Sequence, residues 1–185
     1  MPLSVPNQRT AMHKRRIQCD GYQRQDGLWD IEGHLVDTKP FPLPNRDRGG
    51  EIATGEPLHE MWLRLTLDEG LVIRAAEAVT DHSPFAICPA IGPAYEKLVG
   101  LRVGPGFNRK ARDRLGGVAG CTHLNELLPQ MATAAFQTIY GVRSDGHRPD
   151  APGQGKGIVG TCHALAGDSP VVRDFWPDFY TGEPS

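Results

Sequence analysis

Apolar and polar residues alternate along residues 58–67 with the period of a strand. Met61, Leu63, Leu65 and Leu67 fall on one face, and Trp62, Arg64 and Thr66 fall on the other. A tight turn, Asp68-Glu69-Gly70, is followed by the returning apolar stretch 71–79. This pattern predicts an antiparallel hairpin.

A second hairpin is predicted over residues 15–37. Asp26-Gly27 is a hairpin-turn signal. After it, Ile31, Gly33 and Leu35 share one face, while Glu32, His34 and Val36 share the other. The two hairpins together predict one antiparallel sheet.

Three helices are expected after the sheet. A short helix has Pro93 near its first turn and Gly100 past its end, and a basic helix spans residues 107–115. The third begins after Gly120 and ends near Gly141, with apolar residues at helical spacing: Leu124, Leu127, Leu128, Met131, Ala135 and Ile139. The fold class is therefore α+β, an antiparallel sheet with helices packed on one face.

The remaining segments lack a clear period. Residues 1–13 are expected to be a flexible tail, and residues 14–141 a single domain. Within this domain, residues 38–57 are expected to be a Pro- and Gly-rich loop. Residues 142–158 are of low complexity and predict a mobile linker. Residues 159–185 contain aromatic side chains, which predicts that this segment docks on the domain.

Charge and composition narrow the class of partner. The chain has 20 basic and 22 acidic residues, so neither a nucleic-acid partner nor an acidic tail is favoured. No secretory signal and no apolar run of membrane-spanning length is found. We therefore expect a cytoplasmic protein without a membrane partner. Its four cysteines would then be reduced: Cys19, Cys88, Cys121 and Cys162.

Cys121 and His123 stand at the predicted start of the third helix, after a run of glycines. Backbone N–H groups at a helix N-terminus stabilise a thiolate, which suits a metal ligand and a nucleophile equally. The two side chains converge only if Cys121 precedes the first helical turn. The alternative is that Cys121 fills a glycine-lined corner while His123 lies on the surface.

Spacing alone does not assemble a metal site elsewhere. Taken singly, Cys88 suggests a packed cysteine, His59 a polar strand edge, and Cys162 a single donor beside His163. The chain has no Cys-x-x-Cys pair and no phosphate-binding loop.

Three segments together resemble a bacterial family of unknown function: Asp26-Gly-Leu-Trp-Asp-Ile-Glu-Gly33, His59-Glu-Met-Trp-Leu-Arg-Leu65 and Gly120-Cys-Thr-His-Leu124. The resemblance spans nearly the whole chain. It implies no activity.

Residues 57–140 are also similar in layout to the iron–sulfur scaffold proteins of the NifU/IscU type. Leu58-His-Glu-Met-Trp-Leu63 resembles the strand that opens their hairpin, Ile87-Cys88-Pro89 stands at their second cysteine, and Gly120-Cys-Thr-His-Leu124 stands at their third. Their first cysteine falls on Pro57, and their lysine is replaced by Leu101. The resemblance implies a ligand set of His59, Cys88 and Cys121, with His123 or Cys162 as a fourth.

Such a mixed Cys/His set suits zinc or iron. The expected function is therefore metal binding. One alternative is a metal-dependent or cysteine-dependent enzyme acting on a small molecule, with Glu60 as the catalytic base. The other is a non-catalytic domain whose cysteines are structural.

Overall fold

The computed structural model describes residues 3–143 and 157–183. The chain divides into two units, Met1–Ile139 and Tyr140–Ser185. None of the described helices is both long and apolar enough to cross a bilayer.

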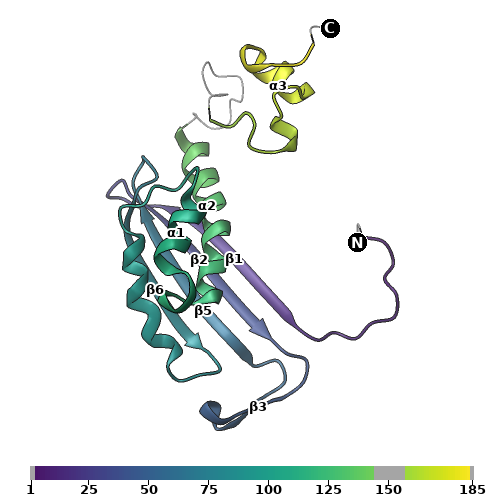
Figure 1. Ribbon diagram of the computed structural model, residues 1–185, viewed down its shortest axis with the longest axis vertical. Coiled ribbons are helices and arrows are strands. Elements are labelled where there is room, and N and C mark those ends of the chain that lie inside the picture. The colour runs from purple at the N-terminus through teal and green to yellow at the C-terminus, as the bar shows by residue number, and fades with distance from the viewer. Residues whose placement is uncertain (1–2, 144–156, 184–185) are drawn as a thin grey trace. The chain divides into compact units, whose positions relative to one another are not determined.

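The first unit contains a four-stranded antiparallel sheet with helices on one face (Figure 1). Its strand order is β1-β2-β5-β6. The strands are β1 (Lys14–Gln23), β2 (Trp29–Thr38), β5 (Pro57–Leu67) and β6 (Ile73–His82). The predicted α+β class is confirmed, and both hairpins form where the alternation placed them.

The expected loop at residues 38–57 is partly wrong. It contains β3 (Leu43–Asn45), the 3-10 turn η1 (Arg46–Arg48) and β4 (Gly50–Ile52). Strands of three residues are too short to show a period. The Asn45 side chain accepts a hydrogen bond from the Arg48 N–H, and Gly49 takes a left-handed conformation (φ 79°) that closes the turn.

Strand register divides the sheet into a covered and an open face. Along β2 every second residue is buried, starting at Trp29 and ending at Asp37. Asp37 pairs with Arg15 of β1 on one side and with His59 of β5 on the other. A charged row therefore continues the apolar rows of the covered face at one end of the sheet.

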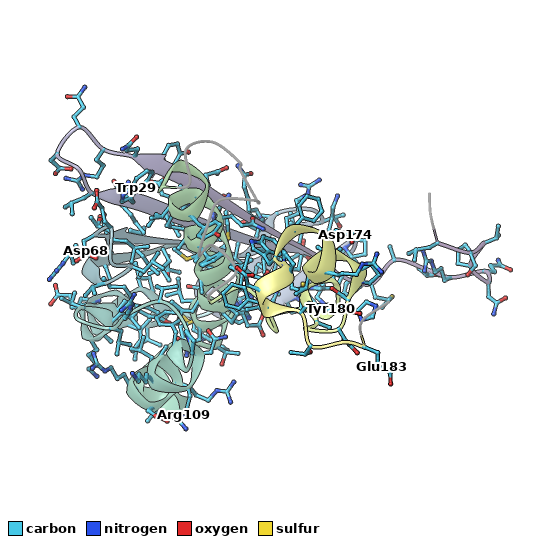
Figure 2. The ribbon with its side chains drawn as sticks, turned by 90° about the horizontal axis from the view of Figure 1, so that it is seen from above. Trp29, Asp68, Arg109, Asp174, Tyr180 and Glu183 are labelled. Carbon is cyan, nitrogen blue, oxygen red and sulfur yellow. The ribbon has the colours of Figure 1, made fainter. Side chains whose placement is uncertain are left out.

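Four helical segments follow the sheet: η2 (Cys88–Leu98), α1 (Phe107–Leu115), η3 (Gly117–Ala119) and α2 (Thr122–Arg143), whose last residues belong to the second unit. The helix expected near Pro93 is instead an eleven-residue 3-10 segment that begins at Cys88. Pro89 and Pro93 have no N–H to donate, which disfavours the α-helical hydrogen-bond pattern. The basic side chain of Arg109 on α1 points away from the strands (Figure 2).

Helix α2 packs unusually close to β2. A Cβ atom added at Gly33 would lie 2.7 Å from the sulfur of Met131. The apolar face predicted for this helix is buried in the core, including Leu124, Leu127 and Ile139. This close contact fixes the N-terminal end of α2 over the charged end of the sheet.

The second unit is small. It contains η4 (His163–Leu165), α3 (Pro170–Phe175) and η5 (Pro177–Phe179). The Ser169 hydroxyl accepts from the Val172 N–H and caps α3. Most of the expected linker, residues 142–158, lies outside the described residues, and docking of residues 159–185 on the domain stays a prediction.

Candidate metal-binding site

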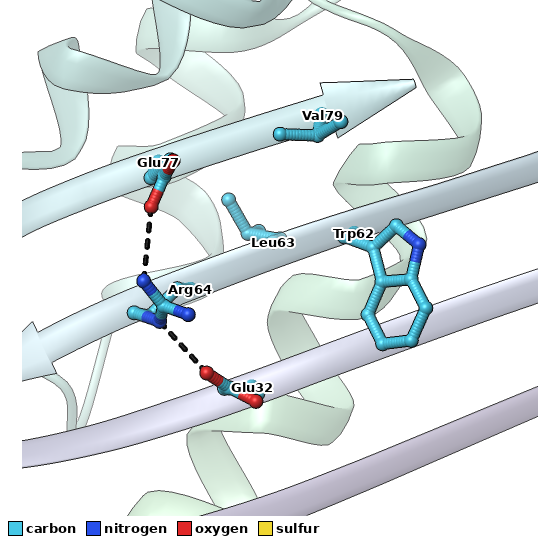
Figure 3. Close-up of a pocket in the computed structure, with 6 residues that line it drawn as sticks. All are labelled: Glu32, Trp62, Leu63, Arg64, Glu77 and Val79. Carbon is cyan, nitrogen blue, oxygen red and sulfur yellow. Dashed lines mark hydrogen bonds and ion pairs between the residues drawn. The ribbon is translucent and has the colours of Figure 1, made fainter. Parts of the chain in front are cut away.

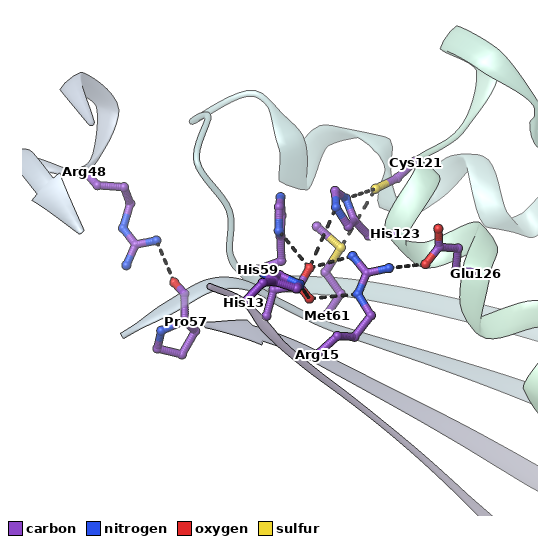
Figure 4. Close-up of polar contacts among 10 residues, drawn as sticks. His13, Arg15, Arg48, Pro57, His59, Met61, Cys121, His123 and Glu126 are labelled. Carbon is purple, nitrogen blue, oxygen red and sulfur yellow. Dashed lines mark hydrogen bonds and ion pairs between the residues drawn. The ribbon is translucent and has the colours of Figure 1, made fainter. Parts of the chain in front are cut away.

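Charged and polar side chains converge at one end of the covered face, where β1, β2 and β5 meet the start of α2 (Figure 4). Arg15, Asp37 and His59 come from the three strands, and His123 comes from the first turn of the helix. Strand pairing brings the first three together, and the packing of α2 adds the fourth.

Asp37 is the centre of this cluster and is only 1% exposed. Arg15 binds its carboxylate with two hydrogen bonds, from Nε to Oδ1 at 2.8 Å and from a terminal nitrogen to Oδ2 at 2.7 Å. Burial opposes ionisation of Asp37, but the Arg15 hydrogen bonds and charge outweigh it and hold the pKa of this carboxyl below its ordinary value. Arg15 also contacts Glu126 of α2.

Two histidines lie against the same oxygen of Asp37. His59 Nδ1 is 3.2 Å from Oδ2, and His123 Nε2 is 3.9 Å from it. The two rings stack with their centroids 3.7 Å apart. His13 reaches the other oxygen at 3.1 Å from the partly exposed chain before β1.

Both stacked imidazoles favour the neutral form. Burial, together with the neighbouring His123, lowers the pKa of His59 to about 4. Burial and the Arg15 charge also lower the pKa of His123. Near neutral pH the cluster therefore offers one carboxylate and two uncharged imidazoles, which is the protonation state that metal ligands need.

Cys121 lies beside this cluster. It immediately precedes α2, so the condition for its side chain to approach His123 is met. Its Sγ is 4.0 Å from His123 Nδ1 and 3.9 Å from the sulfur of Met61. Tyr95 holds its backbone, accepting from the Cys121 N–H at 3.2 Å and donating to the Cys121 carbonyl at 3.1 Å or to Asn125 Oδ1 at 2.8 Å. Burial raises the pKa of Tyr95, so the phenol remains a donor.

Among the described residues, one group of three metal-ligating side chains has its donor atoms within 4.8 Å of one another: Asp37, His59 and His123. Two of these were predicted from the sequence. The structure thus brings His59 and His123 together, with Cys121 adjacent to His123.

Two other predicted site residues of the first unit, Cys88 and Glu60, are not in the group of three. Cys88 is the first residue of η2 and is not in the group of three. Cys162 belongs to the second unit. Glu60 lies on the open face of the sheet, between His34 at 3.1 Å and His82 at 2.9 Å, because neighbouring residues of a strand point to opposite faces.

Sequence reasoning missed Asp37 and Arg15. A signal for Asp37 was present, since it continues the Ile31, Gly33, Leu35 series on the face that the pattern assigns to the core. A carboxylate at a core position is rare without a partner. The partner, Arg15, is fixed only by the register of β1 against β2.

Comparison with known proteins gives a family without an activity. No curated protein and no solved structure matches the chain. A family model described as "Protein of unknown function (DUF2889)" matches residues 13–137, a span that contains every residue of the cluster. Because this match covers more than half of the chain, the protein belongs to the DUF2889 family.

Proposed function

We propose that this domain binds a single divalent metal ion, Zn²⁺ in the first instance, through Asp37, His59 and His123. The observation that carries the proposal is the convergence of these three donors, with the two half-buried histidines around the buried Asp37. Their protonation states support it as well, because an ionised carboxylate and neutral imidazoles need no deprotonation before a metal binds.

The distances are compatible with a small metal ion. Two donors that each bind tetrahedral zinc at about 2.0–2.1 Å lie roughly 3.4 Å apart. The Asp37–His59 distance of 3.2 Å and the Asp37–His123 distance of 3.9 Å bracket this value. Ferrous iron takes the same donor set of two histidines and one carboxylate, so it is the competing ion.

Arg15 and the metal ion can share Asp37. A carboxylate has about four acceptor positions. Arg15 uses two of them and His13 uses one, which leaves one for a metal. Ligating carboxylates are usually held by further hydrogen bonds, and Arg15 would have this orienting role.

The donor set favours a mononuclear ion over an iron–sulfur cluster. Clusters are held mainly by cysteine thiolates. In the first unit, Cys121 lies 4.0 Å from His123, and Cys88 is not in the group of three. Cluster assembly would need ligands that this arrangement does not bring together.

The test is metal content after anaerobic purification and zinc loading, measured by elemental analysis and equilibrium dialysis. We expect one zinc per chain in the wild type and none in His59→Ala or His123→Ala. His82→Ala removes a histidine from the open face and is the matched control that should keep the metal. Zinc retained in both cluster variants, or absent from the folded wild type, would exclude this site.

A second candidate function is a cysteine-dependent enzyme. The specific observation is the order Cys121, His123, Asp37, in which the two imidazole nitrogens of His123 face Sγ at 4.0 Å and Oδ2 at 3.9 Å. Contacts of this length often shorten when substrate binds. The order matches a nucleophile, its base and the group that orients the base.

Alkylation of Cys121 by iodoacetamide distinguishes the two functions. In a chain whose other cysteines are replaced by serine, a working Cys–His pair predicts that His123→Ala slows alkylation near neutral pH by about tenfold or more. An unchanged rate would leave metal binding as the function of the cluster.

A further inference from the structure

The open face of the sheet is a distinct chemical surface. The helical segments η2, α1, η3 and α2 lie on the other face (Figure 1). On the open face, strand pairing aligns side chains in rows across the sheet. One row contains Glu32, Arg64 and Glu77, and the next contains His34, Trp62 and Val79.

A cavity of about 230 Å³ lies between these two rows (Figure 3). It is lined by Glu32, Trp62, Leu63, Arg64, Glu77 and Val79. Trp62 is 39% exposed and Val79 is 43% exposed, so the apolar part of the lining is accessible to a ligand.

The Trp62 side chain is held in place. Its ring stacks on His34 with centroids 3.5 Å apart and planes 6° from parallel. Its Nε1–H donates to Asp81 at 2.8 Å. A rigid aromatic surface loses little conformational entropy when a ligand packs against it.

The surroundings of this surface are acidic. Arg64 donates to Glu32 at 2.7 Å and to Glu77 at 3.1 Å, and these three residues leave one net negative charge on the lining. The excess of acidic groups extends beyond the lining. Three neighbouring cross-strand rows pass through Arg64, Trp62 and Glu60. Together with Asp81 they contain five carboxylates and two guanidinium groups. The carboxylates are Asp20, Glu32, Glu60, Glu77 and Asp81, and the guanidinium groups are those of Arg16 and Arg64. The field of this face attracts cations and repels anions.

We propose that this cavity binds a positively charged side chain, arginine or lysine, of a partner polypeptide. Tryptophan is the best aromatic partner for such a cation, and the Glu32 and Glu77 carboxylates stand beside it. The cavity volume of about 230 Å³ is below the roughly 300–1,000 Å³ of pockets that enclose whole small-molecule ligands, and it suits one side chain. The open face, which none of η2, α1, η3 and α2 covers, gives the rest of a polypeptide a surface to lie on.

This site is separate from the proposed metal site. Trp62 and Met61 are neighbours in β5, but their side chains lie on opposite faces of the sheet, and only Met61 contacts the metal-site cluster through Cys121. Binding of the cation should therefore be the same in the presence and absence of a metal chelator. Failure of the metal proposal would leave the cation site untouched.

The test uses the peptide acetyl-Gly-Arg-Gly-amide and its citrulline counterpart, which keeps the shape of arginine without its charge. The probes are the NMR signals of the Trp62 indole N–H and of the Leu63 and Arg64 backbone amides, and the two amides serve alone where Trp62 is replaced. We expect a saturable shift with the arginine peptide and weaker binding of the citrulline peptide. We also expect affinity to fall about two- to fivefold in Trp62→Leu, from the loss of an exposed cation–π contact.

Two further variants and one small ligand complete the design. Glu77 is exposed, so Glu77→Gln should leave the fold intact, and it should weaken binding of the arginine peptide. Trp176→Phe in the second unit should leave that binding unchanged. Equal binding of the two peptides, unchanged affinity in Trp62→Leu and Glu77→Gln, or no saturable shift would overturn the proposal. Methylguanidinium binding as tightly as the peptide would also overturn it, because the ligand would then be a small free cation and not a polypeptide.

Discussion

The stability of the metal-free protein should fall between neutral pH and about pH 4.5, and His59 should account for much of the fall. The pKa of His59 is lowered from 6.5 to about 4 by burial and by His123, and its side chain is only 12% exposed. Folding therefore favours the neutral ring. Over this interval the unfolded chain binds more protons than the folded chain. The stability that His59 contributes is therefore fully present above pH 6.5 and is lost as pH falls toward 4.

The size of the effect follows from the shift. Each pKa unit corresponds to about 1.4 kcal/mol of difference between protonation states. A change from 6.5 to about 4 sets an upper limit of roughly 3.5 kcal/mol for His59. The pKa of His123 is also lowered, so it contributes in the same direction. The pKa of Asp37 is lowered from 3.8, so the stability that its ionised form contributes is lost only at lower pH, outside this interval.

The assay is urea unfolding at a series of pH values in the presence of a chelator, for wild type and His59→Asn. Asparagine keeps an N–H that can donate to Asp37 but does not titrate in this range. We expect the wild type to lose about 2–3 kcal/mol more than the variant between neutral pH and about pH 4.5. Parallel curves for the two proteins would refute the argument that folding holds His59 neutral.

Three further predictions concern the cluster and its supports, all measured by urea unfolding. Arg15→Met should lower the free energy of unfolding by about 3–5 kcal/mol, because it leaves a buried carboxylate without its cation. Arg64→Met on the open face should lower it by about 1 kcal/mol or less, and equal losses would contradict the role given to burial. Tyr95→Phe should cost about 1–3 kcal/mol, since the Cys121 N–H and the Asn125 side chain lose their partner, and a neutral result would mean that Tyr95 does not fix the start of α2. Gly33→Ala should cost about 1–3 kcal/mol because its new Cβ would lie 2.7 Å from the Met131 sulfur; an unchanged midpoint would mean that α2 can move away freely.

Much of the sheet follows from the sequence because long strands repeat their pattern. The β5–β6 hairpin is visible in the alternation that starts at Met61, and the helical period from Leu124 to Ile139 marks α2. Elements of three residues, such as β3 and β4, repeat nothing and were missed. Proline spacing altered η2 in a way that apolar periodicity does not reveal.

The site was only partly predictable, because strand pairing between distant segments creates it. His59 entered the predicted ligand set through the resemblance to NifU/IscU-type scaffolds, and His123 through that resemblance and its position at the start of a helix. Asp37 joins them through the β2–β5 register and Arg15 through the β1–β2 register, neither of which is written in a local pattern. Glu60 shows the converse: its adjacency to His59 in sequence suggested a shared site, but the pleat of the strand separates the two side chains.

The place of Arg15 on β1 has a kinetic consequence. Among the described strands, β1 is an edge strand that pairs with β2 alone, and most of its residues are exposed. Edge segments of this kind open locally more often than the centre of a sheet. Each opening of β1 would detach the guanidinium from Asp37 and uncover that carboxylate, so hydrogen–deuterium exchange of the β1 amides and the rate at which an ion enters or leaves the cluster should rise and fall together.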